Sequence, residues 1–584
     1  MLVLIDHIKT RKELANILNI SEKKLTYILY VKKIDNMYRT FSIPKKNGET
    51  REINAPEKML NFVQKNLAKF LLNYRNGIYK KENINNKVSH GFEKEKSFIT
   101  NAELHKNKRY VLNFDLKDFF DCFHFGRVKG YFEKNRYFKL SKDIATILAQ
   151  LTCYKKCLPQ GAPTSPIIVN LIFNMVDIQI IKLAKTYKLN YTRYADDITF
   201  STNDKFFLEK YSEFENKFLY IIEKYGFVIN KNKTRLQCKD YRQKVTGLVV
   251  NKKINVAREY YKETRAMAHQ LYKTGSFFIE ENKSGTINQL EGRFSFINQI
   301  EKYNNIIDIK KGGKKHRIAT FSNKEKEYSK FLFYKNFFNM GKPIIFTEGK
   351  TDVMYIKAAL KNLYKKYPNL VEETKTGFDY KIIFFRKSKK NRYLLNIETN
   401  GADTMKNIAN FYAGTESFPN YIEYLKNISK QKPNNPIILL FDNEIESKNK
   451  PIKNFISCKA VKSFYKDNIL EKQLKEKNYA CLKDNLYVQV TPLIGNIKEG
   501  DIETLFKKET LAHKINDKSF TKKDKYDNEY YYGKEIFSKY VYDSYKDIDF
   551  SNFVYLLDNI NDIIKDYQIR KAGKYDMHPK YWTY

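Results

Sequence analysis

Cysteine is scarce in this sequence, with six residues in a chain of 584. So few cysteines exclude the disulfide framework of a small secreted domain. Cys153 and Cys157 are the one close pair, and the second pair that a zinc site needs is missing. Residues 1–9 do not resemble a signal peptide, and no apolar run approaches the roughly 18 residues of a membrane span. We therefore expect a reduced, cytoplasmic protein without a membrane partner.

Acidic residues are few compared with basic ones. The chain has 66 Asp and Glu against 107 Lys and Arg, a formal net charge of +41. This imbalance excludes an acidic or neutral metabolic enzyme as the default interpretation and indicates a polyanionic partner. Hydrophobic residues make up 42% of the chain and aromatic residues 15%, too much for a disordered basic tail. The composition predicts a folded protein that binds nucleic acid.

The sequence pattern changes near residue 304. Before it, FSIPKKNGETREINAP predicts a hairpin, and apolar runs at residues 110–114, 197–201 and 245–250 predict strands between helices. That mixture favours an α+β fold. After it, the basic stretch IDIKKGGKKHR predicts a solvated connector. PIIFTEG, TDVMYIKAALKNLYKKY and PIILLFDNE then follow as strand, helix and strand, which predicts a second, α/β unit.

Three carboxylates of the first half stand at predicted strand ends. Asp115 follows the apolar run 110–114, and Asp196 and Asp197 lie within YTRYADDITFS. Adjacent acids in a strand-like sequence are costly unless a turn exposes them or a cation neutralises them. A hairpin tip beside the end of another strand would bring the three together, where they could hold two Mg²⁺ for in-line nucleotidyl transfer. An ordinary pair of turn aspartates with a helix-capping Asp115 is the alternative on spacing alone.

The tetrapeptide YADD at 194–197 resembles the catalytic motif of reverse transcriptases. NFDLKDFF at 113–120, LPQGAPTSPIIVN at 158–170, GFVINKNKTR at 226–235 and VTGLVVN at 245–251 resemble the other motifs of that family, in the same order. The resemblance implies a right-hand polymerase with fingers and palm in residues 1–255 and a thumb in 256–304.

The resemblance also implies roles for single residues. Asp115 and Asp196 would be the metal ligands, with Asp197 in support, and all three would be catalytic. Phe120 would place a ring beneath the sugar and favour deoxynucleotides, whereas Phe119 is expected in the core. The other nucleotide-binding residues implied are Gln160 and Gly161 in the pocket and the triphosphate-binding cations Lys45, Lys46 and Arg51. Each of these cations could instead be a solvated surface charge.

Two short strings resemble signatures of retron reverse transcriptases. They are NAELH, from Asn101 to His105, and VTG at 245–247. In this subfamily GFxxGxS often carries a glycine where this chain has Glu95, which places the local backbone geometry in question. A buried, hydrogen-bonded histidine is the alternative for His105. The implied RNA-binding residues are Asn101, His105, Val245, Thr246 and Gly247, joined by Arg265 on a basic helix of the thumb.

Acids at strand ends recur in the second half. Glu348 follows the strand of PIIFTEG, Asp352 comes soon after, and Asp442 and Glu444 end the strand of PIILLFDNE. This order resembles a Toprim domain in which Glu444 replaces the second aspartate. Glu348 would then act as a general base, and Asp442 and Glu444 would bind one or more Mg²⁺. The later residues Glu503 and Lys534 resemble the nuclease branch more weakly.

The expected architecture is an α+β right-hand polymerase (fingers, palm and thumb) followed by an α/β Toprim-like domain. Residues 305–340 would be a basic connector, and 341–584 the Toprim-like effector domain with a C-terminal extension. The family resemblance implies a bacterial, antiphage retron enzyme that copies its own noncoding RNA into multicopy single-stranded DNA. Its partners would be that RNA, the RNA–DNA product and deoxynucleoside triphosphates, and a homo-oligomer stays open.

Three alternatives remain at this point. The chain could be another bacterial reverse transcriptase, of the group II intron or abortive-infection type. It could also be an RNA-binding scaffold with a vestigial polymerase site. The Toprim-like unit could bind a partner without catalysing a reaction.

Overall fold

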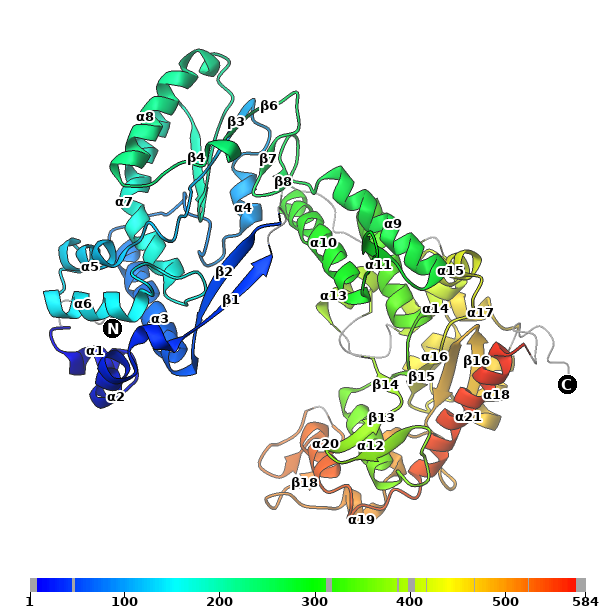
Figure 1. Ribbon diagram of the computed structural model, residues 1–584. Helices are drawn as coiled ribbons and strands as arrows, with labels where there is room; N and C mark the ends of the chain where they lie inside the picture. The colour runs from blue at the N-terminus through cyan, green and yellow to red at the C-terminus, as the bar shows by residue number, and fades with distance from the viewer. Residues whose placement is uncertain are drawn as a thin grey trace. The chain divides into compact units, whose positions relative to one another are not determined.

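The computed structural model describes residues 8–44, 48–310, 318–385, 388–397, 405–415, 417–466, 468–523 and 525–573. They divide into two compact units after Ala257, and each unit is described by itself (Figure 1).

The first unit is α+β, as predicted. Its helices are α1 (Arg11–Ile17), α2 (Glu22–Thr26), α3 (Lys58–Lys81), α4 (Phe98–Glu103), α5 (Phe125–Lys134), α6 (Lys142–Thr152), α7 (Ser165–Thr186) and α8 (Tyr211–Lys224). Its strands are β1 (Tyr38–Pro44), β2 (Thr50–Pro56), β3 (Tyr110–Asp115), β4 (Asn190–Tyr194), β5 (Asp197–Thr202), β6 (Arg235–Cys238), β7 (Lys244–Val245) and β8 (Leu248–Val249).

An antiparallel sheet in the order β4-β5-β3-β6 forms the centre of this unit. β3 is buried along nearly its whole length, which its apolar sequence allows. Phe114 packs its ring against Phe200 of β5 and Phe218 of α8, with centroids 6.0 and 4.7 Å apart. This packing fixes the register of β3 against β5, and the register decides which residues meet at the strand ends.

Helix α7 corrects one expectation from the sequence. It is the one described helix that is long and apolar enough to cross a membrane by length and composition, so the statement that no segment approaches a span is wrong. More than half of its most apolar stretch is buried inside the unit. The helix also carries Asn170 and Asp177 into that interior. We interpret α7 as the core helix beneath the sheet.

The second unit has α/β architecture. Its helices are α9 (Arg258–Thr274), α10 (Ile287–Lys310), α11 (Asn323–Phe333), α12 (Lys350–Asn362), α13 (Lys389–Leu395), α14 (Met405–Ala413), α15 (Tyr421–Ser429), α16 (Pro451–Ile456), α17 (Lys459–Lys462), α18 (Ile469–Lys477), α19 (Lys508–Leu511), α20 (Lys534–Asp543) and α21 (Phe553–Lys571). Its strands are β9 (Phe278–Glu280), β10 (Lys283–Ser284), β11 (Ile344–Phe346), β12 (Val371–Thr374), β13 (Gly377–Tyr380), β14 (Ile383–Phe384), β15 (Ile437–Phe441), β16 (Tyr479–Lys483), β17 (Leu486–Val490), β18 (Ser519–Phe520) and β19 (Tyr531–Tyr532).

A five-stranded sheet in the order β14-β11-β15-β17-β16 lies at the centre of the second unit. All neighbouring pairs are parallel except β16 with β17. Every residue of β11 and β15 is buried, as expected for strands covered on both faces. Because these two strands are adjacent and parallel, the acids that follow them emerge at one edge of the sheet.

The predicted basic connector at 305–340 is wrong where the structure describes it. Residues 323–333 form α11, and a π-helical turn follows at Tyr334–Phe338. Phe331 of α11 is fully buried and stacks on Phe294 of α10, with centroids 5.0 Å apart. Phe337 then packs on Phe346 of β11 at 6.0 Å. The basic stretch drew attention away from the aromatic residues that follow it.

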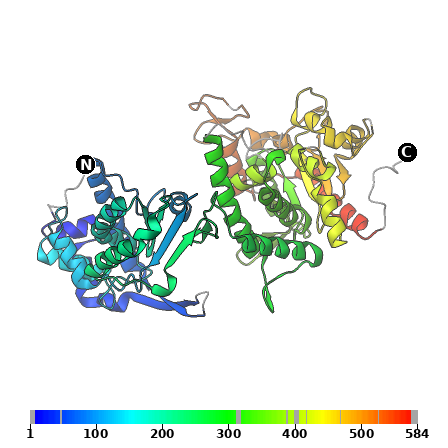
Figure 2. The ribbon, with the colours of Figure 1, turned by 90° about the horizontal axis from the view of Figure 1, so that it is seen from above.

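Helices α9 to α11 therefore share one hydrophobic core with the second sheet. In both ribbon views the green helices α9 and α10 lie beside the yellow-green helices of the same unit (Figures 1 and 2). The predicted separation of a thumb at 256–304 from a domain at 341–584 does not correspond to a boundary in this core.

The shared core predicts that a cavity in α11 weakens the second sheet. Phe331→Ala should destabilise the second unit by about 3–5 kcal/mol, because it removes a fully buried ring. Hydrogen–deuterium exchange of peptides covering β15 should become faster. Phe278→Ala, at a side chain that is 50% exposed, is the matched control and should leave that exchange unchanged. Unchanged exchange in both variants would show that α11 does not support the sheet.

Candidate active site

The three acids of the first unit meet at the end of its central sheet. Asp115 is the last residue of β3, and the strand register places it opposite Asp197, the first residue of β5. The carbonyl of Asp196 accepts a hydrogen bond from the Leu116 amide at 3.1 Å. Ala195 turns the chain between β4 and β5 with φ of 56°. The predicted hairpin tip beside a strand end is therefore present.

Burial and repulsion between neighbouring charges raise the pKa values of Asp196 and Asp197. Burial is the main cause for Asp197, whose pKa rises to about 7, and the charges of Asp196 and Asp115 add to it. Burial also raises the pKa of Asp196, with a further contribution from Asp115. The site therefore holds more negative charge than its protein surroundings neutralise.

Lys233 is the cation that the sequence did not single out. Its Nζ donates to both carboxylate oxygens of Asp115, at 2.9 and 3.1 Å. This hydrogen bond raises the pKa of Lys233. The residue lies in the string GFVINKNKTR, but nothing in the spacing distinguishes it from the neighbouring lysines.

The donor set fits the magnesium ions that the family resemblance implies. Among the described residues no three His, Cys, Asp or Glu side chains are already arranged around one metal position. Lys233 instead occupies both oxygens of Asp115. Three clustered carboxylates, two of which have raised pKa values, and one bound cation form an oxygen-only site that a hard divalent ion would stabilise.

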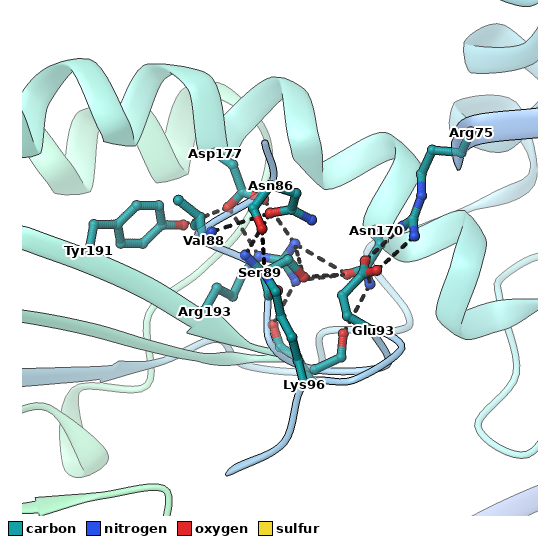
Figure 3. A network of polar contacts seen from close by, with 12 residues as sticks. Arg75, Asn86, Val88, Ser89, Glu93, Lys96, Asn170, Asp177, Tyr191 and Arg193 are labelled. Atoms are coloured by element: carbon teal, nitrogen blue, oxygen red, sulfur yellow. Dashed lines mark hydrogen bonds and ion pairs between the residues drawn. The ribbon is translucent and has the colours of Figure 1, made fainter. Parts of the chain in front are cut away.

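A buried polar network holds the hairpin in place (Figure 3). Arg193 of β4 is fully buried and forms an ion pair with Asp177 of α7 at 2.9 Å. Tyr191 donates to the same carboxylate at 2.6 Å. The guanidinium also donates to the carbonyl of Ala195 at 3.2 Å, which ties the network directly to the turn between the acids.

The loop at 86–96 supports the same hairpin. The Arg193 amide donates to Val88, and the His90 amide donates to Arg193, so this loop extends the edge of the sheet. Gly91 packs so closely that a Cβ there would overlap the Ala195 amide nitrogen. Glu95 adopts φ of 64°, a left-handed backbone conformation that favours glycine. The position where the resemblance led us to expect glycine therefore has a backbone suited to glycine.

The predicted nucleotide-binding residues occupy two elements beside the acids. Burial raises the pKa of Asp196, and the charge of the exposed Arg51 of β2 partly opposes this rise, so Arg51 acts on the acid cluster. The carbonyl of Gln160 accepts from the Asn54 amide of β2 at 2.8 Å. Gly161 lies so close to β2 that a Cβ would approach the Asn54 carbonyl oxygen at 2.8 Å. Lys45 and Lys46 lie outside the described residues.

The two phenylalanines after Asp115 differ in burial. Phe119 lies in the core, as predicted, with 3% of its surface exposed. Phe120 is half-buried and packs against Phe119 with centroids 5.8 Å apart. The partial exposure of Phe120 is compatible with the predicted contact to a sugar.

Three predicted RNA contacts are wrong. Asn101, His105 and Val245 are fully buried, so their side chains cannot reach RNA. His105 bridges β4 and β5 through Thr192 and Ser201, each at 2.7 Å, which is the alternative stated for it above. Burial lowers its pKa to about 3, so the ring stays neutral.

The VTG string is a turn and not part of a continuous strand. Thr246 and Gly247 have φ of 45° and 83°, and they divide the predicted strand 245–250 into β7 and β8. The Thr246 hydroxyl donates to the Phe98 carbonyl at 3.0 Å and so anchors the turn to α4.

Arg265, the RNA-binding residue predicted in the thumb, lies exposed on α9 in the second unit.

A second group of acids lies at the edge of the second sheet. The Asp442 amide donates to Glu348 at 3.1 Å, so the ends of β15 and β11 are joined. Burial raises the pKa of Asp442 to about 9, and the charges of Glu348, Asp352, Asp501 and Glu503 add to the shift. This group has the same electrostatic character as the first.

The sequence predicted only part of this second acid group correctly. Lys534 forms an ion pair with Glu503 at 3.0 Å and lies 3.8 Å from Asp501. The sequence drew attention to Lys534 and Glu503 but not to Asp501. Glu444, predicted as a metal ligand, instead forms an ion pair with Lys450 at 2.6 Å.

Comparison with known proteins identifies a common family. The family model for reverse transcriptase (RNA-dependent DNA polymerase) matches residues 43–257. The retron Ec86 reverse transcriptase of Escherichia coli is 33% identical over 323 residues, which cover 54% of this chain and 90% of that protein. The retron Mx65 reverse transcriptase of Myxococcus xanthus is 34% identical over 251 residues, covering 40% of this chain and 56% of that protein.

Among solved structures, telomerase from Candida albicans is similar over 55% of this chain and 63% of that chain. The sequence identity is 14% and the TM-score is 0.30.

The raised pKa of Asp197 predicts a specific dependence of stability on pH. An unfolded aspartate titrates near about 3.9, so without metal the folded chain loses stability as pH rises toward 7. Asp197→Asn removes this loss. The variant should therefore be more stable relative to the unmodified chain at pH 8 than at pH 5, by a difference in the free energy of unfolding of roughly 1–2 kcal/mol.

Urea unfolding in EDTA at the two pH values measures this difference. Asp240→Asn, at an exposed position, is the control and should show no such change. An equal effect of pH on both variants would show that Asp197 titrates normally.

Proposed function

The chain belongs to the retron reverse transcriptases, and on that premise we propose that it copies part of a structured noncoding RNA into multicopy single-stranded DNA. It is an RNA-directed DNA polymerase. The observation that carries the proposal is the convergence of Asp115, Asp196 and Asp197 at one end of the central sheet, where their charge exceeds what Lys233 neutralises.

Each residue of the site has a proposed task in nucleotide addition. Asp115 and Asp196 would hold two Mg²⁺, and Asp197 would add negative charge beside them. When bound, the ions would lower the pKa of the attacking hydroxyl and neutralise the triphosphate. Metal binding would release Lys233 from Asp115, which leaves a lysine beside the charge that develops on the phosphates.

The surroundings of the acids would select the nucleotide. The exposed Arg51, which acts electrostatically on Asp196, is placed to meet triphosphate oxygens. Phe120 would exclude a ribose 2′-hydroxyl by overlap and so favour deoxynucleotides. Gly161 would bring the backbone of its loop close to the nucleotide.

The RNA partner follows from the family and from the charge of the chain. Retron enzymes begin synthesis at the 2′-hydroxyl of a guanosine in their own RNA, and we propose the same here. The exposed Arg265 on α9 is the remaining side chain of the second unit predicted to contact that RNA. The proposed setting is the cytoplasm of a bacterium.

For the second unit we propose a Toprim-like, metal-dependent nuclease that acts as the effector in antiphage defence. The supporting observation is Asp442, whose pKa rises to about 9 among four other acids at one sheet edge. Such a group favours a divalent cation over its own protons at neutral pH. Glu348 would act as a general base, and Asp501 joins the proposed metal ligands. Glu444 is a weaker candidate because Lys450 neutralises it.

The polymerase proposal predicts the nucleic acid that copurifies with the protein. The unmodified chain should carry a branched RNA–DNA molecule, whereas Asp196→Asn should carry the RNA alone, because the acids serve metals and not RNA phosphates. Sequencing of the bound nucleic acid and primer extension with Mg²⁺ measure both effects. Extension should fall at least about 100-fold in Asp196→Asn.

Asp240→Asn is the control for charge removal at an exposed position and should behave like the unmodified chain. Unbranched cellular RNA in every preparation would favour the group II intron or abortive-infection alternative. Normal extension by Asp196→Asn would contradict the site assignment.

The effector proposal predicts that the two acid groups act separately. Asp442→Asn should retain primer extension but lose growth arrest or phage protection. Glu444→Gln should retain more of the protection, because Lys450 already pairs with Glu444. Plating efficiency of phage is the measurement, with protein levels compared by immunoblot. Full protection by Asp442→Asn would mean that the unit is a binding module.

A further inference from the structure

A surface groove in the second unit lies apart from both groups of acids. Residues of α9, α11 and α15 line two hollows of about 280 and 370 Å³, which share Arg265 and Glu327 in their walls. One volume lies just below and the other near the lower end of the roughly 300–1,000 Å³ found for small-molecule sites. None of the acids proposed to bind metal contributes to either wall.

A residue in the wall of the first hollow has a buried hydroxyl without a partner. Tyr272 of α9 lines this hollow and is 2% exposed, and its hydroxyl has no hydrogen-bond partner among the described residues. A buried polar group in this condition is rare in proteins and calls for an explanation. Burial, with a contribution from the charge of Glu327, raises its pKa well above the ordinary value. The hydroxyl therefore remains protonated and can donate to an anion.

The groove carries uncompensated positive charge. Three of its cations, Lys262, Arg265 and Lys326, have no ion-pair partner among the described residues. The single acid in the walls, Glu327, is already paired with Lys330 at 3.1 Å. Since Lys262, Arg265 and His269 follow one face of α9, their side chains line the same side of the groove.

Aromatic rings accompany these charges. The Arg265 guanidinium lies 5.8 Å from the ring of Tyr261, and the Lys330 ammonium lies 4.1 Å from the ring of Tyr424. Cations next to tyrosine rings are suited to a ligand that has both a phosphate and a flat base. A carboxylate ligand would use the cations but leave the rings without a role.

We propose that the groove formed by α9, α11 and α15 binds a nucleotide phosphate, with the Tyr272 hydroxyl, Lys262 and Arg265 as donors and the neighbouring tyrosines as surfaces for the base. The phosphate belongs either to a free mononucleotide or to a nucleotide within a single strand. Arg265 then serves this site, which goes beyond the RNA contact proposed for it above.

Occupancy of this groove has a structural consequence. Its three helices belong to the hydrophobic core of the second sheet. A ligand that bridges α9 to α11 and α15 stabilises their packing in proportion to its concentration. The groove would thereby couple a nucleotide signal to the stability of the second unit.

Isothermal titration calorimetry on the full chain with its copurified nucleic acid tests the proposal. One probe is dAMP, and the other is an oligothymidylate with a 5′-hydroxyl end. Tyr272→Phe should weaken binding roughly five- to tenfold, because it removes one donor to a charged group. The substitution deletes only an unpartnered oxygen, so the melting temperature should not fall. Lys262→Ala should weaken binding about threefold or more.

Lys472→Ala is the control, because it removes an exposed lysine of α18 outside the groove. Primer extension on the same samples separates this site from the polymerase site and should be unchanged in Tyr272→Phe. Binding of dAMP identifies a mononucleotide site. Binding of the oligonucleotide alone, with a salt dependence that becomes shallower in Lys262→Ala, identifies a strand phosphate. Either result supports the proposal.

Two results would overturn it. One is the absence of binding of either probe at millimolar concentration. The other is an affinity that Tyr272→Phe and Lys262→Ala leave unchanged, since binding would then occur elsewhere on this basic chain.

Discussion

The structure depends on one constraint, which is that carboxylates of like charge are held close together at buried strand ends. In the first unit the sheet register places Asp115 directly opposite Asp197, an arrangement that costs free energy in any antiparallel pair. The cost is tolerated because the core on the other side of the strands fixes the register. The buried ion pair between Arg193 and Asp177 of α7 holds the turn at Ala195 in place. The repulsion that remains is what a divalent cation would relieve.

The second unit meets the same constraint with a different architecture. Adjacent parallel strands, rather than a hairpin, bring Glu348 and Asp442 to one edge. Lys534 partly neutralises the group through Glu503, much as Lys233 does for Asp115. In both units a lysine stands beside the acids, and in both one buried carboxylate keeps a raised pKa. Unrelated folds have thus arrived at one electrostatic solution.

The sequence was informative wherever chemistry is local to a short string. Asp115, Asp196 and Asp197 could be placed together because a hairpin and a strand end follow from neighbouring residues. The strands before Glu348 and Asp442 could be predicted for the same reason. Lys233 could not be distinguished, since a lysine among lysines acquires its role only from the fold. His105 and Asn101 were misassigned because a motif records which residues occur but not whether they face the solvent. The aromatic residues of α11 were hidden behind a basic stretch whose composition suggested a linker.

The aromatic contact between α10 and α11 has a consequence for how such a chain can be recombined. Phe294 and Phe331 join helices next to the polymerase motifs to the sheet that carries the second acid group. Consider a chimera that replaces this sheet with another domain and is joined within the glycine-containing stretch after α10. It would expose one half of the shared core on each side of the junction. The unit that can be transplanted begins at α9. A domain exchange designed on this core would keep α9 to α11 with the second sheet and place the junction at Ala257.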